Sequence, residues 1–160
     1  MRILVVDAVG INRLLLSSTL ARWGHSVVSV VDGTDAWELL QKEQFSFVIS
    51  DWLMPKMSGV ELCRRIRATQ FASYVYVILL TSLGQPCEIV EGLEAGADDF
   101  IHKPFNEDEL KARMRAGERI VALERGLLES NQQLRQAYTT LSEDLQAASQ
   151  MQQSLLPSPC

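Results

Sequence analysis

The stretch that decides the fold is VISDWLMPKMSG, residues 48–59. Apolar residues lead into Asp51, and the chain turns soon afterwards through a proline and a Ser-Gly pair. A short apolar run that ends in turn residues is typical of a strand buried on both faces, as in a parallel sheet. We therefore expect Asp51 to stand at the carboxyl end of a buried strand, where such sheets present their functional groups.

Similar runs recur on both sides of this stretch and alternate with helical patterns. Strands are expected at residues 3–6, 26–30, 47–50, 76–80 and 99–102. Helices are expected at residues 12–23, 34–43, 58–69 and 87–95, and a long helix begins near residue 106. This alternation predicts an α/β fold in which five parallel strands are covered by helices on both faces.

Local patterns support two of these helices. In the first, Leu15, Leu16 and Leu20 have the spacing of residues that face a core. Ser58 and Glu61 form a capping box at the start of the third, because a serine hydroxyl can satisfy the free backbone N–H three residues later.

Four polar side chains stand just beyond the predicted strands. They are Asp7, Asp51, Thr81 and Lys103. The carboxyl ends of parallel strands meet at one edge of a sheet, so we expect these side chains to converge. Two carboxylates, a hydroxyl and an ammonium together suit a cation and a phosphoryl group.

The composition excludes several classes of protein. Hydrophobic residues make up 47% of the 160 residues, the net charge is −5 and the isoelectric point is about 5.0. A chain without a basic face is not expected to bind nucleic acid. The three cysteines lack metal-ligand spacing and indicate reduced thiols, while neither a signal peptide nor an apolar run of ~18 residues is present. A cytoplasmic protein with no membrane partner is expected.

The chain resembles the response-regulator receiver domains of bacterial two-component signalling over residues 1–118. The matching stretches are ILVVD (3–7), VISDWLMPKMSG (48–59), LLTS (79–82) and GLEAGADDFIHKPF (92–105). The resemblance implies a flavodoxin-like (βα)5 fold. It also implies that the domain catalyses its own phosphorylation and dephosphorylation, with a histidine kinase or phosphotransfer protein as the phosphodonor.

Roles for single residues follow from the same resemblance. Asp51 resembles the phosphoacceptor, Thr81 the hydroxyl that contacts the phosphoryl oxygens, and Lys103 the lysine that pairs with them. Phe100 occupies the position of the aromatic switch residue, which acts together with Thr81. The Lys103–Pro104 peptide bond is expected to be cis, as in the family.

A magnesium ion is the implied cofactor, with Asp7, Asp51 and the backbone carbonyl of Leu53 as ligands. The family usually has two adjacent acidic residues after the first strand, but here Ala8 follows Asp7. Loss of even an outer-shell partner lowers metal affinity by ~10–100-fold. We therefore expect weak binding of Mg²⁺ and a reduced capacity for phosphorylation.

Beyond the receiver, residues 119–156 have a heptad pattern. The d positions are Leu127, Leu134, Leu141, Ala148 and Leu155, and the a positions are Asn131, Tyr138, Leu145 and Gln152. Such a pattern predicts a coiled coil, and an asparagine at an a position favours a parallel, in-register pair. A parallel homodimer through residues 120–155 is expected.

The end of the chain resembles the segment that leads into PPM-type serine/threonine phosphatase domains of bacterial regulators, over residues 144–159. Residues 157–160 are then a tail or the start of an output domain that the chain lacks. The leading hypothesis is a receiver that relays a phosphorylation signal through a dimeric helix to such a domain.

Three other functions are alternatives to this hypothesis. A pseudo-receiver that works as a dimerisation module without phosphorylation is favoured by Ala8 and opposed by the intact Asp51, Thr81 and Lys103. A nucleotide- or flavin-binding domain is disfavoured because the turn DAVGIN (7–12) is not a glycine-rich phosphate loop. An aspartyl phosphohydrolase would place its nucleophile after the first strand, which Asp51 does not fit.

Overall fold

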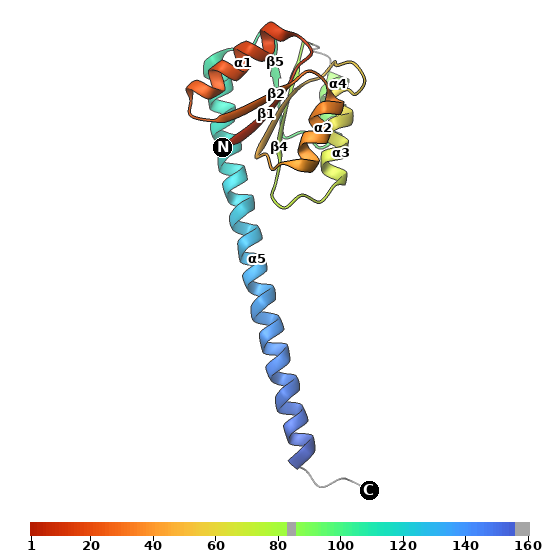
Figure 1. Cartoon of the computed structure of the whole chain (residues 1–160), viewed down its shortest axis with the longest axis vertical. Helices are drawn as coiled ribbons and strands as arrows, with labels where there is room; N and C mark the ends of the chain where they lie inside the picture. Colours follow the sequence, from red (N-terminus) through yellow and green to blue (C-terminus); the bar gives the residue numbers. More distant parts are fainter. Residues whose placement is uncertain (83–85, 156–160) are drawn as a thin grey trace. The chain divides into compact units, whose positions relative to one another are not determined.

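The computed structural model describes the backbone of residues 1–82 and 86–155 and the side chains of residues 1–82 and 88–149. Five strands and five helices alternate in this part of the chain (Figure 1). The strands are β1 Arg2–Val6, β2 Ser26–Val30, β3 Phe47–Asp51, β4 Tyr76–Thr81 and β5 Asp99–His102. The helices are α1 Gly10–Arg22, α2 Gly33–Lys42, α3 Gly59–Ala68, α4 Pro86–Glu94 and α5 Glu107–Leu155.

The strands form one parallel sheet in the order β2-β1-β3-β4-β5. Every neighbouring pair is parallel, so each strand is joined to the next by a helix that crosses over one face. The predicted flavodoxin-like fold is confirmed. The predicted bounds of β2 and β5 are correct, and the bounds of the other strands and of α1 to α4 differ from prediction by one or two residues at an end. The predicted long helix after residue 106 is present as α5.

The sheet has a core on each face because side chains alternate along every strand. One core combines β1 and β3 with α2 and α3, through Leu4, Val6, Val48, Ala36, Leu40, Leu62 and Ile66. The other combines the alternate residues with α1 and the first turns of α5, through Ile3, Val5, Ile49, Leu16, Leu20, Leu110 and Met114. Figure 1 shows α1 on the opposite side of the sheet from α2 and α3.

The prediction that Leu15 faces the core is wrong. Its side chain is 53% exposed, whereas Leu16 and Leu20 are buried. Thr19 completes the buried stripe of α1, and its hydroxyl donates to the carbonyl of Leu15 at 2.8 Å. Three consecutive leucines cannot all face one side of a helix, and the third of them is the one that packs.

Helix ends follow the local chemistry of the sequence. The Ser58 hydroxyl accepts the backbone N–H of Glu61 at 3.1 Å, as one half of the predicted capping box. The side chain of Asn106 accepts the backbone N–H of Asp108 at 2.8 Å at the start of α5. These caps hold the starts of two helices that border the carboxyl edge of the sheet.

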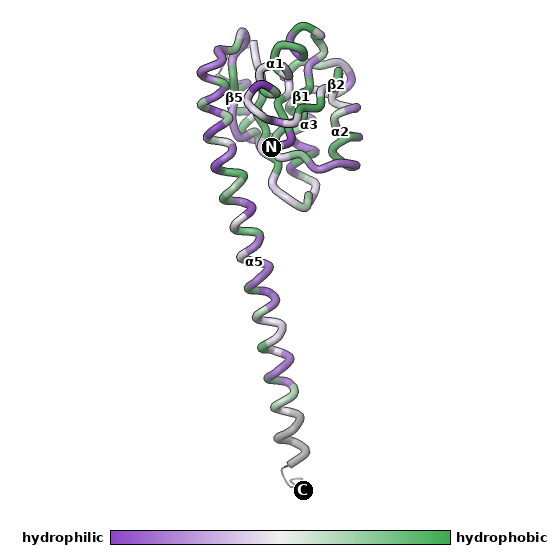
Figure 2. The backbone as a smooth tube through the Cα atoms, turned by 60° about the vertical axis from the view of Figure 1, so that its left-hand side comes forward, coloured by the Kyte–Doolittle hydropathy of each residue, from purple (hydrophilic) through white to green (hydrophobic). Residues whose placement is uncertain are grey.

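The chain divides into two compact units, Met1–Leu123 and Glu124–Cys160, and α5 contributes to both. Within residues 124–149, every side chain except Ser142 is exposed. Figure 2 shows apolar positions recurring along an otherwise hydrophilic α5. Among the described residues, no helix is both long and apolar enough to cross a membrane.

Candidate functional site

Lys103 joins the two predicted aspartates at the carboxyl edge of the sheet. Its Nζ lies 3.0 Å from Oδ2 of Asp7 and 3.0 Å from Oδ2 of Asp51. Its backbone N–H donates to the carbonyl of Thr81 at 2.9 Å, which ties the residue after β5 to the end of β4. The expected convergence of side chains is therefore present for Asp7, Asp51 and Lys103.

The two aspartates of this cluster differ in accessibility. Asp7 is fully buried, and its Oδ1 accepts the backbone N–H of Val9 at 2.9 Å while Oδ2 receives Lys103. The side chain of Asp51 is 15% exposed. Asp7 is thus fixed from both sides, and Asp51 is the carboxylate that a second molecule can reach.

The charge of Lys103 is well stabilised. Burial lowers the pKa of the Lys103 ammonium, but hydrogen bonds and the negative charges of Asp51 and Asp7 outweigh burial and raise it above its usual value. The ammonium therefore remains protonated at neutral pH. It places a permanent positive charge beside the Asp51 carboxylate.

The turn after Asp51 requires the glycine that the opening stretch contains. A Cβ atom on Gly59 would lie 2.3 Å from the Asp51 carbonyl oxygen. The backbone N–H of Gly59 donates to the Trp52 carbonyl at 2.9 Å, and the N–H of Trp52 donates to the Leu80 carbonyl at 2.9 Å. Only a residue without a side chain lets α3 begin this close to the end of β3.

Thr81 and Phe100 belong to the neighbouring strands β4 and β5. Thr81 is buried at the end of β4, opposite His102 in the register. The ring of Phe100 packs on Trp52, with 6.0 Å between the ring centroids. Trp52, which follows the phosphoacceptor candidate directly, is only 8% exposed and belongs to the core.

The residues present can hold a magnesium ion with few protein ligands. Mg²⁺ is commonly bound by one or two carboxylates and several waters, and Asp51 offers an accessible carboxylate. Both carboxylate oxygens of Asp7 already have partners, and Ala8 has no side-chain oxygen. Across the described residues, no group of three or more His, Cys, Asp or Glu side chains is placed to hold a metal. The role of the Leu53 carbonyl stays a prediction.

One feature beside this site was missed by sequence reasoning. A cavity of about 290 Å³ lies between α1 and the segment after β5, with Asp7, Leu15 and Lys103 in its lining. Next to it, α1 exposes Ile11 and Leu14, which are 69% and 64% exposed. The three consecutive leucines at 14–16 were the available sequence signal for this exposed surface, because they cannot all face the core from one helix.

The comparisons with known proteins agree with this geometry. Residues 3–115 match the family model of the response regulator receiver domain. The chain is 43% identical over 121 residues to Response regulator RppA of Synechocystis, covering 74% of this chain and 51% of RppA. It is 37% identical over 116 residues to a chemotaxis protein CheY homolog of Campylobacter jejuni, covering 71% of this chain and 89% of the homolog. The chain thus spans about half the length of RppA.

Solved structures show the same fold. Chemotaxis response regulator CheY4 of Vibrio cholerae superposes with a TM-score of 0.68 at 31% identity, covering 72% of this chain and 97% of CheY4. The receiver domain of a sensor histidine kinase from Pseudomonas aeruginosa, solved with magnesium in its active-site cleft, gives a TM-score of 0.67 at 27% identity. That match covers 76% of this chain and 97% of the other. The expected cis bond between Lys103 and Pro104 is also present.

Proposed function

Because this chain belongs to the response regulator receiver domain family, we propose that Asp51 accepts a phosphoryl group from a histidine kinase or phosphotransfer protein. One observation carries the proposal. The ammonium of Lys103 lies 3.0 Å from the carboxylate of Asp51, which is the accessible member of the pair of aspartates. This arrangement neutralises an anionic nucleophile at the place where an anionic phosphoryl group must approach.

The chemistry is a transfer between two side chains. An oxygen of Asp51 attacks the phosphorus of a phosphohistidine, the P–N bond breaks, and the imidazole leaves as the new acyl phosphate forms. Lys103 offsets negative charge on the transferred oxygens, which lowers the barrier to phosphoryl transfer. A magnesium ion held by Asp51, the Leu53 carbonyl and Asp7 would supply further neutralisation.

The acyl phosphate changes what its neighbours contact. Lys103, which pairs with a carboxylate oxygen of Asp51, gains phosphoryl oxygens as partners. Thr81 stands at the end of the adjacent strand, from which its hydroxyl is proposed to bind the same group. A contact that exists only after phosphorylation favours one of two arrangements of the nearby surface.

The phosphodonor is proposed to dock on α1. Ile11, Leu14 and Leu15 form an exposed apolar surface, and the cavity lined by Leu15, Asp7 and Lys103 borders it. Covering such a surface stabilises a complex, since burial of apolar area is favourable. A donor protein seated there would lie beside the Asp51 and Lys103 pair.

The test of this assignment is covalent modification of Asp51. With Mg²⁺ and acetyl phosphate, the protein is expected to gain one phosphoryl group, located at Asp51 by peptide mapping. The matched control is Asp51→Asn, which keeps the size of the side chain and removes the nucleophile. Equal modification of the two proteins would show that the phosphoacceptor lies elsewhere.

Residues 120–155 are proposed to form a parallel homodimer that passes the signal to an output domain. Within the described side chains, the a and d positions hold apolar residues that are exposed in one chain: Leu127 57%, Leu134 68%, Tyr138 74%, Leu141 58% and Leu145 63%. Full burial of a large apolar side chain stabilises by ~1.5–3 kcal/mol. Asn131 and Ala148 also belong to the pattern and are exposed. The side chains of Gln152 and Leu155, its last two positions, lie outside the described residues.

Light scattering after size exclusion tests the dimer. The wild-type chain is expected to be a dimer at micromolar concentration, and Leu134→Lys a monomer, because a buried ammonium would stand in the seam. Gln136→Lys introduces the same charge two residues away, at an f position, and is expected to remain dimeric. A monomeric wild-type chain, or a dimeric Leu134→Lys variant, would contradict the proposal.

The proposed output is a serine/threonine phosphatase, and this rests on the resemblance of residues 144–159 alone. A second candidate function is a phosphorylation-independent dimerisation module, which the missing carboxylate at Ala8 favours. The two experiments separate them. A stable dimer that acquires no phosphoryl group on Asp51 would support the second function.

A further inference from the structure

Gly92 stands where α4 meets the ring of Phe100. A Cβ atom added to Gly92 would lie 2.5 Å from Cζ and 2.7 Å from Cε1 of Phe100, and 2.9 Å from Cζ3 of Trp52. Real Cβ atoms do not approach other atoms this closely, so no side chain fits at this position unless the rings move. The helix backbone itself therefore forms one wall of the niche that holds the Phe100 ring.

The backbone of Gly92 gives no other reason for a glycine. It lies inside α4, and its φ is not positive, unlike those of Gly24 and Gly96 at +90° and +103°. Glycine weakens a helix relative to alanine. A buried glycine with ordinary helical backbone in the last turn of α4 therefore points to a neighbour that needs the space, and that neighbour is the aromatic pair.

The niche lies one residue from the phosphoacceptor candidate. Its second wall is Trp52, whose ring is inclined by 31° to that of Phe100 with 6.0 Å between centroids. Trp52 directly follows Asp51, and its N–H is held by the Leu80 carbonyl at the end of β4. The position of the Phe100 ring is therefore coupled by contact to the strand that carries Asp51.

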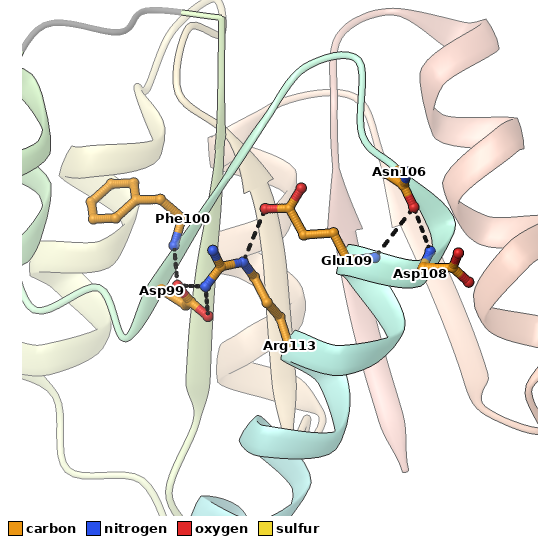
Figure 3. A network of polar contacts seen from close by, with 6 residues as sticks. All are labelled: Asp99, Phe100, Asn106, Asp108, Glu109 and Arg113. Carbon is orange, nitrogen blue, oxygen red and sulfur yellow. Dashed lines mark hydrogen bonds and ion pairs between the residues drawn. The ribbon is translucent and has the colours of Figure 1, made fainter.

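The backbone of Phe100 is held separately. Its N–H donates to Oδ1 of Asp99 at 2.8 Å, and the Arg113 guanidinium of α5 lies 2.8 and 3.0 Å from the two oxygens of Asp99. Figure 3 shows this network, with the Phe100 ring pointing away from Arg113. With the backbone fixed to α5, rotation of the side chain is the freedom that remains to Phe100.

We propose that Gly92 is the positioning residue of the aromatic switch: its missing side chain opens the inward niche that Phe100 occupies against Trp52. A side chain at position 92 expels the ring toward solvent. The proposal deepens the proposed function, because an inward ring matters for signalling only if Asp51 is modified. The placement of the ring itself is independent of phosphorylation and can be measured without a phosphodonor.

The first measurement is the environment of the ring. Fluorine NMR of protein labelled with 4-fluorophenylalanine gives one resonance for each of the five phenylalanines, and Phe100→Leu identifies the one of interest. In Gly92→Ala this resonance is expected to move toward the solvent-exposed value. Gly126→Ala is the matched control, because a Cβ there meets nothing within 4 Å. An unchanged Phe100 resonance in Gly92→Ala would overturn the proposal.

The second measurement is coupling to Asp51. Beryllofluoride mimics the phosphoryl group, and Gly92→Ala is expected to raise the concentration for half-saturation by about fivefold or more, the low end of usual coupling between sites. In the Phe100→Leu background the same substitution is expected to have a smaller effect, since the ring it expels is gone and only the contact with Trp52 remains. An equal rise in both backgrounds would overturn the role of Phe100. Failure of the wild-type protein to bind beryllofluoride would refute the proposed function and leave the ring measurement valid.

If Gly92→Ala does not fold, the double variant with Phe100→Leu decides the interpretation. If Gly92→Ala unfolds but Gly92→Ala with Phe100→Leu folds, the collision between positions 92 and 100 is demonstrated by rescue. If both proteins unfold, Gly92 is required for a reason other than Phe100, and the proposal fails.

Discussion

Gly117 and Gly126 both lie inside α5, yet replacing each by alanine is predicted to have opposite effects. A Cβ on Gly117 would lie 2.6 Å from Cε1 of Phe47 and 2.9 Å from Cε1 of Tyr76. Those two rings pack on each other with centroids 5.2 Å apart, and both are buried. Gly126 is exposed, and a Cβ there meets nothing within 4 Å.

The magnitudes follow from two terms. Alanine is favoured over glycine in a helix interior by ~1 kcal/mol. Overpacking a well-filled core destabilises by ~1–3 kcal/mol. For Gly117→Ala the cost of overpacking exceeds the gain in helix propensity by about 1 kcal/mol. This net destabilisation lowers the melting temperature by about 4 °C in a unit of this size. For Gly126→Ala only the first term acts, so helicity is expected to rise and the unfolding of the receiver unit to stay unchanged.

Thermal unfolding followed by circular dichroism measures both variants. The contact itself is tested by adding Phe47→Leu, which shortens the side chain that the new methyl meets. In that background Gly117→Ala is expected to destabilise less than in the wild-type protein. A higher melting temperature for Gly117→Ala than for the wild-type protein would refute the reasoning. It would mean that the helix at position 117 does not pack on Phe47 and Tyr76.

Two further predictions concern the metal site and pH. Ala8→Asp is expected to raise the affinity for Mg²⁺ by ~10–100-fold, because it adds a carboxylate beside Asp7; superimposable calorimetric titrations of variant and wild type would contradict this. Burial, then the charge of the N-terminal amine, lowers the pKa of His25 below its ordinary 6.5, against the opposing charge of Glu118. The folded state therefore favours the neutral ring of His25. Its contribution to the free energy of unfolding is present above about pH 6.5 and is lost as the pH falls below that value. Urea midpoints at about pH 7.5 and about pH 5.5 are expected to differ less in His25→Gln, and an equal difference would exclude His25 as the cause.

The sequence alone was sufficient for the fold and for the cluster of Asp7, Asp51 and Lys103. Strand runs and helix periods are local patterns, and each could be recognised without knowing its neighbours. The rule that parallel strands end at one edge then placed three distant residues together. For the metal site, the resemblance to receiver domains implied a second acid at the position that Ala8 occupies.

Only the tertiary structure decided which side chains are covered. Leu15 fits a helical period as well as Leu16 does, but the sheet covers one side of α1 and leaves Leu15 in solvent. Trp52 directly follows Asp51 in the turn after β3, and only the tertiary structure shows that its ring is buried against Phe100.

The contact of Gly92 with Phe100 shows why the sequence pattern does not determine contacts between segments. The two residues belong to α4 and β5, and nothing in the period of either segment specifies how close the helix axis comes to the ring. Period and propensity act within one segment of the chain, whereas the distance between segments is set by the volumes of all the side chains packed between them.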